Sequence, residues 1–329
     1  MMAIQIVGEG RDARLILGEA PDPEPGCGEV RIAVAATAVN RADLLQRRGL
    51  YPPPPGASEI LGLECAGRVD RLGGGVTFPA IGERVMALLP GGGYAESVVV
   101  HAGSVMPAPR GLSLEEAAAI PEVFLTAYLN LFELGKASAG GWALVHGGSG
   151  GVGTAAIQLL KAEGVRAIVT CGSAERCAKC RRLGADVALD YREGPFAPRA
   201  LEATGGGGVD VILDAVGAPY LEPNLRCLRP GGRLVLIGLM GGRRGEIDLG
   251  PVLTRRLEMV GSTLRGRSPE EKAGIVRRFR ERFGERLESG AIGPVVDRVI
   301  PLERAEEAHG LVERGEAFGK IVLSVRPGS

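Results

Sequence analysis

A glycine pattern in the middle of the chain has the spacing that binds a pyrophosphate. It lies in the sequence VHGGSGGVGTAAIQLL, after a short apolar run and at the start of an amphipathic segment. Glycine lets the backbone turn tightly beside a phosphate, and the N-terminus of the following helix offers free N–H groups to the anion. We therefore predict that Gly148, Gly150, Gly151, Val152 and Gly153 bind a dinucleotide. The alternative is a glycine-rich turn without a ligand.

The residues after the next predicted strand bear on which dinucleotide is bound. NAD-specific folds carry an acid there, about 20 residues after the glycines, that binds the ribose 2′-hydroxyl. This chain has Ser173 and Arg176 instead. A cation is disfavoured in the first turn of a helix, so a bound 2′-phosphate explains Arg176, and we predict NADPH. The alternative is that Arg176 is an exposed surface residue beside Glu175.

A segment beginning at residue 40 combines an amide, a carboxyl group and a phenol. Asn40 precedes a short predicted helix, 41–48, and Asp43 lies in its first turn. The pair matches a capping arrangement, so helix capping explains both residues without a catalytic role. Tyr51 stands before Pro52–Pro55, which stiffen an extended loop that can hold the phenol over a site. The alternative for this loop is a proline-rich ligand of another domain.

The cysteines and histidines show no metal-ligand spacing. Cys177 and Cys180 form a C-x-x-C pair inside a predicted helix, and they lack the second pair that a structural zinc site requires. We interpret them as ordinary thiols. His101, His146 and His309 have no triad or metal spacing, and we expect His146, at the end of a buried strand, to be packed.

The composition is that of a globular protein large enough for two domains. Of 329 residues, 45% are hydrophobic and 24% are charged, and 39 acidic residues balance 39 Lys plus Arg. Binding to nucleic acid generally needs a basic excess, so the zero net charge argues mildly against it. The N-terminus has no secretory signal, and we find no run of about 18 apolar residues to span a membrane. We expect a cytoplasmic protein with reduced cysteines.

The expected secondary structure changes character twice along the chain. Residues 1–118 carry short alternating runs separated by Gly/Pro turns, which is typical of β-strands. From Ala143 onward, apolar strands alternate with amphipathic helices, one of them predicted at Ala174–Leu183, which indicates a parallel, doubly wound sheet. A charged helix, predicted at Pro269–Arg282, and a β/α tail follow. We predict an α/β fold in which 1–118 and 268–329 form one β-rich domain and 119–267 form a Rossmann domain.

Six motifs spread over nearly the whole chain resemble one known family. They are NRADLLQRRGLYPPPPGASEILGLECAG (40–67), MALLPGGGYAE (86–96), AAAIPEVFLTAY (117–128), GGVGTAAIQL (150–159), LIGLMGG (236–242) and GKIVL (319–323). With these motifs the chain resembles the zinc-free branch of the medium-chain dehydrogenase/reductase superfamily, the quinone oxidoreductases, and within it the tumour-suppressor-induced subgroup. The resemblance implies a GroES-like catalytic domain, a Rossmann domain, NADPH as reductant and quinones as acceptors.

The resemblance also implies roles for individual residues. The catalytic pair of the family falls on Asn40 and Asp43. The contacts to the adenosine phosphate fall on Ser173, Arg176 and Tyr191. The contacts on the nicotinamide side fall on Thr126, Ala215, Val216, Gly217, Gly238, Leu239 and Met240. Tyr94 differs from some relatives, and we expect it to alter the mouth of the substrate site.

The same comparison predicts that no metal is bound. Zinc alcohol dehydrogenases resemble this chain in fold, but they hold zinc with Cys, His and a further Cys or carboxylate. At those positions this chain has Asn40 and Leu63, so that Glu64 remains alone, and it lacks the four-cysteine lobe. Without a Lewis acid an alkoxide is poorly stabilised. A quinone ring spreads the incoming charge itself, and the protein then needs mainly to position the reactants and exclude water.

Three functions stay open on the sequence alone. The leading one is a zinc-independent NADPH:quinone oxidoreductase acting on a small quinone-like molecule. The second is an NADPH-dependent enal or enoyl reductase, for which Tyr51 is the candidate proton donor. The third is an NADPH-binding protein with low turnover and an RNA-binding or structural role. We also expect a homodimer, because the predicted strand near Leu257–Leu264 is a last, exposed strand, and such an edge invites a two-fold partner.

Overall fold

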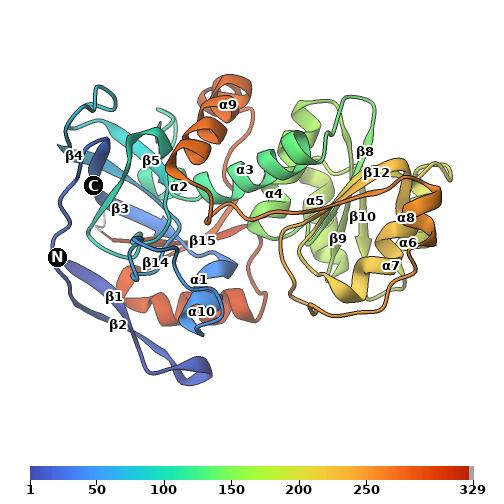
Figure 1. Ribbon diagram of the computed structural model, residues 1–329, viewed down its shortest axis with the longest axis horizontal. Helices are drawn as coiled ribbons and strands as arrows, with labels where there is room; N and C mark the ends of the chain where they lie inside the picture. Colours follow the sequence, from blue (N-terminus) through green and yellow to red (C-terminus); the bar gives the residue numbers. More distant parts are fainter. Residues whose placement is uncertain (326–329) are drawn as a thin grey trace. The chain divides into compact units, whose positions relative to one another are not determined.

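The computed structural model describes residues 1–325 and divides them into two compact units (Figure 1). One unit contains Met1–Leu125 with the described part of Leu264–Ser329, and the other contains Thr126–Thr263. The first division falls inside the helix α3 (Pro121–Tyr128), a few residues beyond the boundary placed at residue 118. We call these the outer unit and the central unit.

The central unit is built on a six-stranded sheet in which every neighbouring pair is parallel. Its order is β10-β9-β8-β11-β12-β13. The strands are β8 (Trp142–His146), β9 (Arg166–Cys171), β10 (Val187–Asp190), β11 (Val209–Asp214), β12 (Leu228–Leu236) and β13 (Glu258–Gly261). Numbered from β8, the strand order is 3-2-1-4-5-6, which is that of the Rossmann fold. The order of successive strands reverses between β8 and β11, so the strands after β11 are added on the other side of β8.

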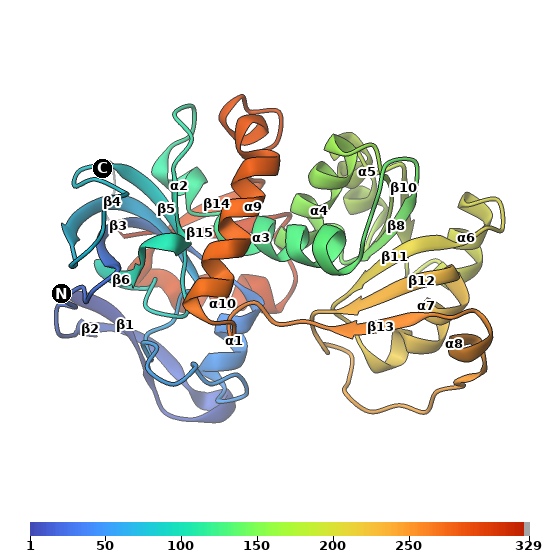
Figure 2. The same ribbon diagram turned by 45° about the horizontal axis from the view of Figure 1, so that its top comes forward.

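Helices cover both faces of this sheet, as Figure 2 shows. The helices α4 and α5 lie on one face and α6 and α7 on the other. Their bounds are Gly151–Ala162 for α4, Ala174–Leu183 for α5, Phe196–Ala203 for α6 and Leu221–Cys227 for α7, and a short helix, α8 (Gly250–Thr254), precedes the last strand. The buried strands are rich in Val, Ile and Leu, as expected where helices cover both faces. The predicted α/β class with a doubly wound sheet is confirmed.

The outer unit contains a hairpin and a larger, mostly antiparallel sheet. The hairpin pairs β1 (Met2–Val7) with β2 (Arg14–Glu19). The sheet has the order β14-β15-β3-β4-β5-β7, and β6 pairs with β3. Its strands are β3 (Glu29–Ala38), β4 (Glu64–Leu72), β5 (Arg84–Leu88), β6 (Ser97–His101), β7 (Val105–Pro107), β14 (Val296–Pro301) and β15 (Lys320–Ser324). The end of the chain therefore returns to the first segment, because β15 is antiparallel to β3.

The helices of the outer unit come from both ends of the chain. They are α1 (Arg41–Arg47), α2 (Leu114–Ala117), α9 (Pro269–Glu288) and α10 (Ala305–Glu313), together with the first part of α3. The charged helix α9 begins at the predicted residue, where Ser268 and Glu271 form a capping box. It continues to Glu288, beyond the predicted end at residue 282, because Phe283 and Leu287 extend its buried face.

One helical stretch, Leu114–Leu134, is long and apolar enough to cross a membrane by length and composition. However, 78% of its apolar window is buried inside the protein, which is the behaviour of a core helix. The stretch is not an unbroken apolar run, because it contains Glu122 and Asn130, so the expectation that no run of about 18 apolar residues exists is not contradicted. The helix is accounted for by packing, as shown by Phe124, which contacts Phe279 of α9.

Candidate active site

Three polar side chains meet in the outer unit where three neighbouring strands end or begin. Asn40 follows β3, Glu64 begins β4 and Lys320 begins β15. The Nζ atom of Lys320 lies 2.7 Å from Oε1 of Glu64 and donates to Oδ1 of Asn40 at 2.6 Å. Nδ2 of Asn40 donates to the same Glu64 oxygen at 2.8 Å. We call these three residues the Glu64 cluster, and antiparallel pairing of β3 with both β4 and β15 brings them together.

The cluster gives Glu64 a partner that the sequence did not indicate. Lys320 neutralises the carboxylate of Glu64, and both side chains are buried. Sequence reasoning missed Lys320, although it lies in the GKIVL motif. Periodicity could not identify it, since a lysine that begins a strand is ordinarily exposed.

Asp43 is completely buried beneath the start of α1 and is held by backbone N–H groups. Its carboxylate accepts hydrogen bonds from Asn40 N at 2.7 Å and from Gly62 N at 3.1 Å. The first of these is half of a capping box. Burial raises the pKa of Asp43 to about 6, and the two N–H donors oppose that rise. Asp43 thus caps the helix, and any catalytic role must act through Asn40 because its exposed fraction is 0%.

Tyr94 is buried, which contradicts its expected place at the mouth of a substrate site. Its exposed fraction is 0%. Its hydroxyl group lies 3.4 Å from a carboxylate oxygen of Asp43 and 3.1 Å from Nε2 of His309. The three side chains form a buried polar chain between α1 and α10, and burial lowers the pKa of His309 to about 3, so the imidazole is neutral.

Tyr51 lies against a buried arginine. The guanidinium carbon of Arg265 is 5.4 Å from the centre of the Tyr51 ring, and Nη1 donates to the Tyr51 carbonyl at 3.2 Å. Other N–H groups of Arg265 reach Pro90 O and Gln46 Oε1, each at 2.7 Å. Within residues 1–325 the phenol group makes no hydrogen bond, and partial burial is the main reason that its pKa is raised. Sequence reasoning missed Arg265, which holds this loop in place.

The helix α3 carries one predicted site residue and one that was missed. Thr126 is half-buried, and its carbonyl accepts a hydrogen bond from Asn130 Nδ2 at 2.8 Å. Glu122 stands four residues earlier, so both side chains lie on the same face of the helix. The backbone N–H of Glu122 donates to Oε2 of Glu64 at 2.9 Å. Burial, followed by the charge of Glu64, raises the pKa of Glu122 to about 8.

The glycine turn of the central unit has the close packing that the pattern predicts. A Cβ atom on Gly153 would lie 2.3 Å from the carbonyl oxygen of Gly147, and one on Gly148 would lie 2.6 Å from Cβ of Val169. No side chain fits at either position. Gly150 caps α4, whose first turn, 151–153, has N–H groups without intrahelical acceptors. The turn can therefore accept an anion at the carboxyl edge of the sheet.

Arg176 reaches back across this turn. Its Nη1 atom donates to Ser149 Oγ at 3.3 Å, and its backbone N–H donates to Ser173 Oγ, also at 3.3 Å. Ser173 thus caps α5. Tyr191 is 46% exposed, and its hydroxyl group lies so close to Gly172 that a Cβ atom there would be 2.7 Å away. The structure brings the predicted phosphate contacts together and adds Ser149, which sequence reasoning had not singled out.

The predicted nicotinamide contacts of the central unit lie on two adjoining loops. One loop follows β11 and contains Ala215, Val216 and Gly217, and the other follows β12 and contains Gly238, Leu239 and Met240. Met240 N donates to Ala215 O at 3.0 Å, and Gly241 N donates to Val216 O at 2.8 Å. Both loops leave the same carboxyl edge as the glycine turn, which is where ligands bind in open α/β sheets.

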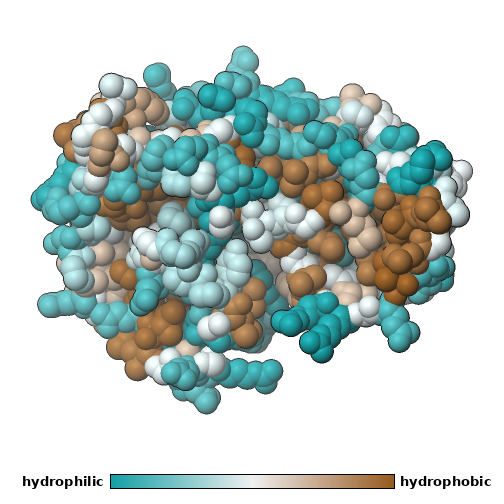
Figure 3. Space-filling view, in the orientation of Figure 1, coloured by the Kyte–Doolittle hydropathy of each residue, from teal (hydrophilic) through white to brown (hydrophobic). Residues whose placement is uncertain are grey.

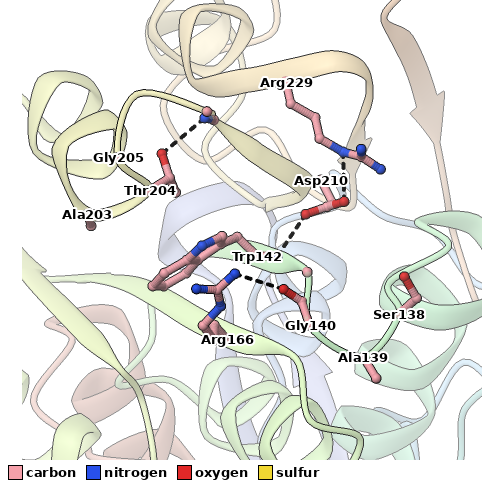
Figure 4. A pocket seen from close by; sticks show the side chains of 13 residues that line it. Ser138, Ala139, Gly140, Trp142, Arg166, Ala203, Thr204, Gly205, Asp210 and Arg229 are labelled. Atoms are coloured by element: carbon pink, nitrogen blue, oxygen red, sulfur yellow. Dashed lines mark hydrogen bonds and ion pairs between the residues drawn. The ribbon is translucent and has the colours of Figure 1, made fainter.

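A pocket of about 650 Å³ lies elsewhere in the central unit (Figure 4). It is lined by Trp142, Arg166 and Arg229, which lie where β8, β9 and β12 begin. Its polar groups bond to one another: Arg229 pairs with Asp210 at 2.7 Å, and the Arg166 guanidinium lies 4.2 Å from the Trp142 ring. It stands at the opposite edge of the sheet from the glycine turn and is not the dinucleotide site.

Comparison with known proteins assigns the chain to a family. Residues 151–281 match the zinc-binding dehydrogenase family, and residues 26–110 match the alcohol dehydrogenase GroES-like domain. A quinone oxidoreductase of Rattus norvegicus is 30% identical over 305 residues, which cover 92% of this chain and 90% of that protein. The chain belongs to the medium-chain dehydrogenase/reductase family. Its outer unit is thus the GroES-like part and its central unit the Rossmann part of an oxidoreductase of this family.

Two further relatives of this medium-chain dehydrogenase/reductase differ in kind. The structure of the Escherichia coli quinone oxidoreductase complexed with NADPH has a TM-score of 0.87 and 29% identity, and the match covers 99% of this chain and all of that one. A phenolphthiocerol/phthiocerol polyketide synthase subunit of Mycobacterium tuberculosis is 30% identical over 98% of this chain. The chain spans only 15% of the length of that synthase subunit.

The remaining candidate ligands of this dehydrogenase/reductase do not gather around a metal position. Cys177 and Cys180 are buried free thiols of α5, and Sγ of Cys180 lies 3.5 Å from Sγ of Cys171. Throughout residues 1–325, no three His, Cys, Asp or Glu side chains are grouped so that they could hold a metal ion. His146 is packed between Phe196 and Tyr220, as expected.

Proposed function

We propose that the chain is an NADPH-dependent, zinc-independent oxidoreductase of the tumour-suppressor-induced quinone oxidoreductase subgroup, which transfers a hydride to quinone-like acceptors. The observation that carries this proposal is the ion pair between Lys320 and Glu64, with 2.7 Å between Nζ and Oε1. Zinc sites of this fold need anionic ligands. Here the one carboxylate at a ligand position already has a cation and the amide of Asn40 as partners. A site without a Lewis acid suits an acceptor that stabilises its own negative charge.

The residues of the central unit fit NADPH. The glycine turn at 148–153 would hold the pyrophosphate, and Arg176, Ser173 and Tyr191 would hold the 2′-phosphate. Arg176 supports this assignment because its guanidinium group is already directed to Ser149 of the turn. Thr126 and the loops at 215–217 and 238–240 would contact the nicotinamide, and bound NADPH would supply the hydride.

The residues of the outer unit would shape the acceptor side of the reaction. Asn40 is held by Glu64 and Lys320, so its amide has one fixed orientation. Asp43 is a positioning residue, because it binds the backbone N–H of Asn40 and is itself inaccessible. Tyr51 stands partly exposed on the loop that Arg265 holds, where its phenol can contact an acceptor.

A second candidate function is enal or enoyl reduction. The similarity to the polyketide synthase subunit favours it. This chemistry also needs a proton donor for the α-carbon, and the phenol of Tyr51 is free of hydrogen bonds within the described residues 1–325.

A steady-state screen of NADPH oxidation tests the proposal. The purified protein is offered ortho-quinones, para-quinones and enals, with NADH as the matched alternative reductant. We expect the highest kcat/KM with NADPH and a quinone. Turnover of enals alone would favour the second candidate, and absence of NADPH oxidation with every acceptor would contradict both.

A further inference from the structure

The side chain of Glu122 is half-buried, and among the described residues its carboxyl group neither caps a helix nor forms an ion pair. Its backbone N–H is fixed by Oε2 of Glu64 at 2.9 Å, which ties the first turn of α3 to the Glu64 cluster. Its own carboxyl group makes no hydrogen bond and no ion pair with any residue of 1–325. Four positions later on the same helix face stands Thr126, which we proposed above as a nicotinamide contact.

Charged and titratable groups from six other segments lie around this carboxyl group. They are Asp43 of α1, Tyr51, Glu64 of β4, Arg265, Lys272 of α9 and Lys320 of β15. Lys272 is only 6% exposed and has no carboxylate within ion-pair distance among the described residues. Lys272 and Lys320 would partly stabilise the carboxylate that remains after Glu122 loses its proton, but burial and the charge of Glu64 outweigh them, so the carboxyl group holds its proton to a higher pH than an ordinary glutamate does.

We propose that Glu122 is the catalytic acid of the reaction, which donates its carboxyl proton to the acceptor as the hydride arrives. The inference rests on the proposed function. It assigns the proton to Glu122 rather than to Tyr51, the donor that the sequence suggested. The phenol is the weaker acid of the two: burial, followed by the charge of Glu122, raises the pKa of Tyr51 above 10.0, whereas the pKa of Glu122 is about 8.

The step is balanced in atoms and electrons. The acceptor gains a hydride, which carries two electrons and one hydrogen nucleus, and NADPH is oxidised to NADP⁺. The O–H bond of the Glu122 carboxyl group breaks, and its proton forms an O–H bond on a quinone or a C–H bond on an enal. The carboxylate that remains is protonated again from water. Tyr51, held by Arg265, then orients the acceptor without giving up its own proton.

The first test measures the proton on Glu122 directly, without turnover. Infrared spectra of wild-type protein and of Glu122→Gln are subtracted at a series of pH values. We expect a protonated carboxyl band at pH 7 that is absent from the variant and that disappears with a midpoint near 8. Glu115→Gln, which changes a partly exposed acid on the neighbouring helix α2, is the matched control and should leave the band unchanged. Absence of a protonated carboxyl group at pH 7 would overturn the proposal.

The second test is kinetic and uses the same proteins. General acid catalysis is worth about 100-fold or more, so Glu122→Gln should lower kcat at least roughly 100-fold while the NADPH dissociation constant is unchanged. Wild-type kcat should fall as the pH rises through 8, because only the protonated acid donates, and the small kcat that is left in Glu122→Gln should lack this fall. Glu122→Asp keeps a carboxylic acid, so it should recover part of the turnover. Its kcat should again fall as the pH rises above the pKa of the new aspartate.

The outcomes separate this inference from the proposed function. If the wild-type protein does not oxidise NADPH with any of the acceptors tested, the proposed function is contradicted, and the role of Glu122 is overturned with it. An active wild type beside an equally active Glu122→Gln variant overturns only the role of Glu122. The role of Glu122 would also be overturned if Glu122→Asp lost as much activity as Glu122→Gln while circular dichroism showed both variants to be folded.

Discussion

The Nζ atom of Lys320 lies 2.7 Å from Oε1 of Glu64, and the two side chains are only 4% and 0% exposed. Removal of one partner from a buried pair leaves the other charge without compensation, which typically costs about 3–5 kcal/mol. We therefore expect Lys320→Met to lower the free energy of unfolding by about that amount in urea titrations. The double variant Glu64→Gln/Lys320→Met should recover much of the loss. Arg304→Met, which breaks the exposed pair with Glu307, is the control and should change the stability little.

Asp43 should make the stability of the protein fall between acid and neutral pH. Its pKa is raised from 3.8 to about 6, so the folded protein holds this proton more tightly than the unfolded chain does. The stability from this proton is fully present below pH 3.8 and is lost as the pH rises through about 6. In Asp43→Asn this loss should be absent. Urea titrations of both proteins from pH 4 to 7 test this, and parallel curves would contradict it.

Arg176 should determine the preference for NADPH over NADH. A charge-assisted hydrogen bond contributes about 1.5–3 kcal/mol, so Arg176→Ala should weaken NADPH binding roughly 10- to 100-fold. NADH binding should barely change, because NADH has no 2′-phosphate. Fluorescence titrations with both cofactors supply the dissociation constants, and Arg182→Ala, an exposed arginine on the same helix, is the control. Equal weakening of both cofactors would show that Arg176 does not bind the phosphate.

Zinc should be dispensable for activity. The carboxylate of Glu64 is engaged by Lys320 and Asn40, so it is not free to bind a metal ion. We expect elemental analysis of the active protein to find no stoichiometric zinc, and incubation with a chelator to leave kcat unchanged. One zinc ion per chain, lost together with activity, would overturn the mechanism proposed above.

The edge of the Rossmann sheet should form a homodimer interface. The strand β13 is the last strand of the sheet, and Met259 on it is 40% exposed. Near α7 and α8 the surface shows an apolar area (Figure 3), and Leu253 of α8 is 80% exposed. Exposed apolar surface beside an unpaired edge favours a two-fold partner. We expect a dimer mass by light scattering at micromolar concentration.

Charge substitutions test whether the dimer forms through β13, the edge of the Rossmann sheet, or through β14, an edge of the outer sheet. Met259→Lys should convert the dimer to a monomer, because a charge would be buried without a partner. Val299→Lys places the same charge on β14, the edge strand of the outer sheet, where Val299 is 47% exposed, and it should leave the dimer intact. A wild-type monomer, or a dimer that survives Met259→Lys, would contradict the predicted interface.

The sequence by itself determined the architecture of the central unit and the position of its glycine turn. Local patterns carry this information, because a strand, a tight turn and an amphipathic helix each leave a short-range signature. The helix α5 occupies the predicted residues, Ala174–Leu183, and the steric limits at Gly148 and Gly153 explain why the pattern needs glycine there. The motif GKIVL pointed to the family without indicating which of its residues mattered.

Only the tertiary structure decided which polar groups face one another in the outer unit. Lys320 and Glu64 are far apart in the sequence, and the pairing of β15 and β4 with β3 joins them. The same folding buries Tyr94 against His309, although its sequence position suggested an exposed site, and it leaves Glu122 unpaired beside Lys272. Composition and periodicity are local properties, whereas burial, ion pairing and the pKa of a carboxyl group depend on contacts between distant segments, so the chemistry of this site could be assigned only from the folded chain.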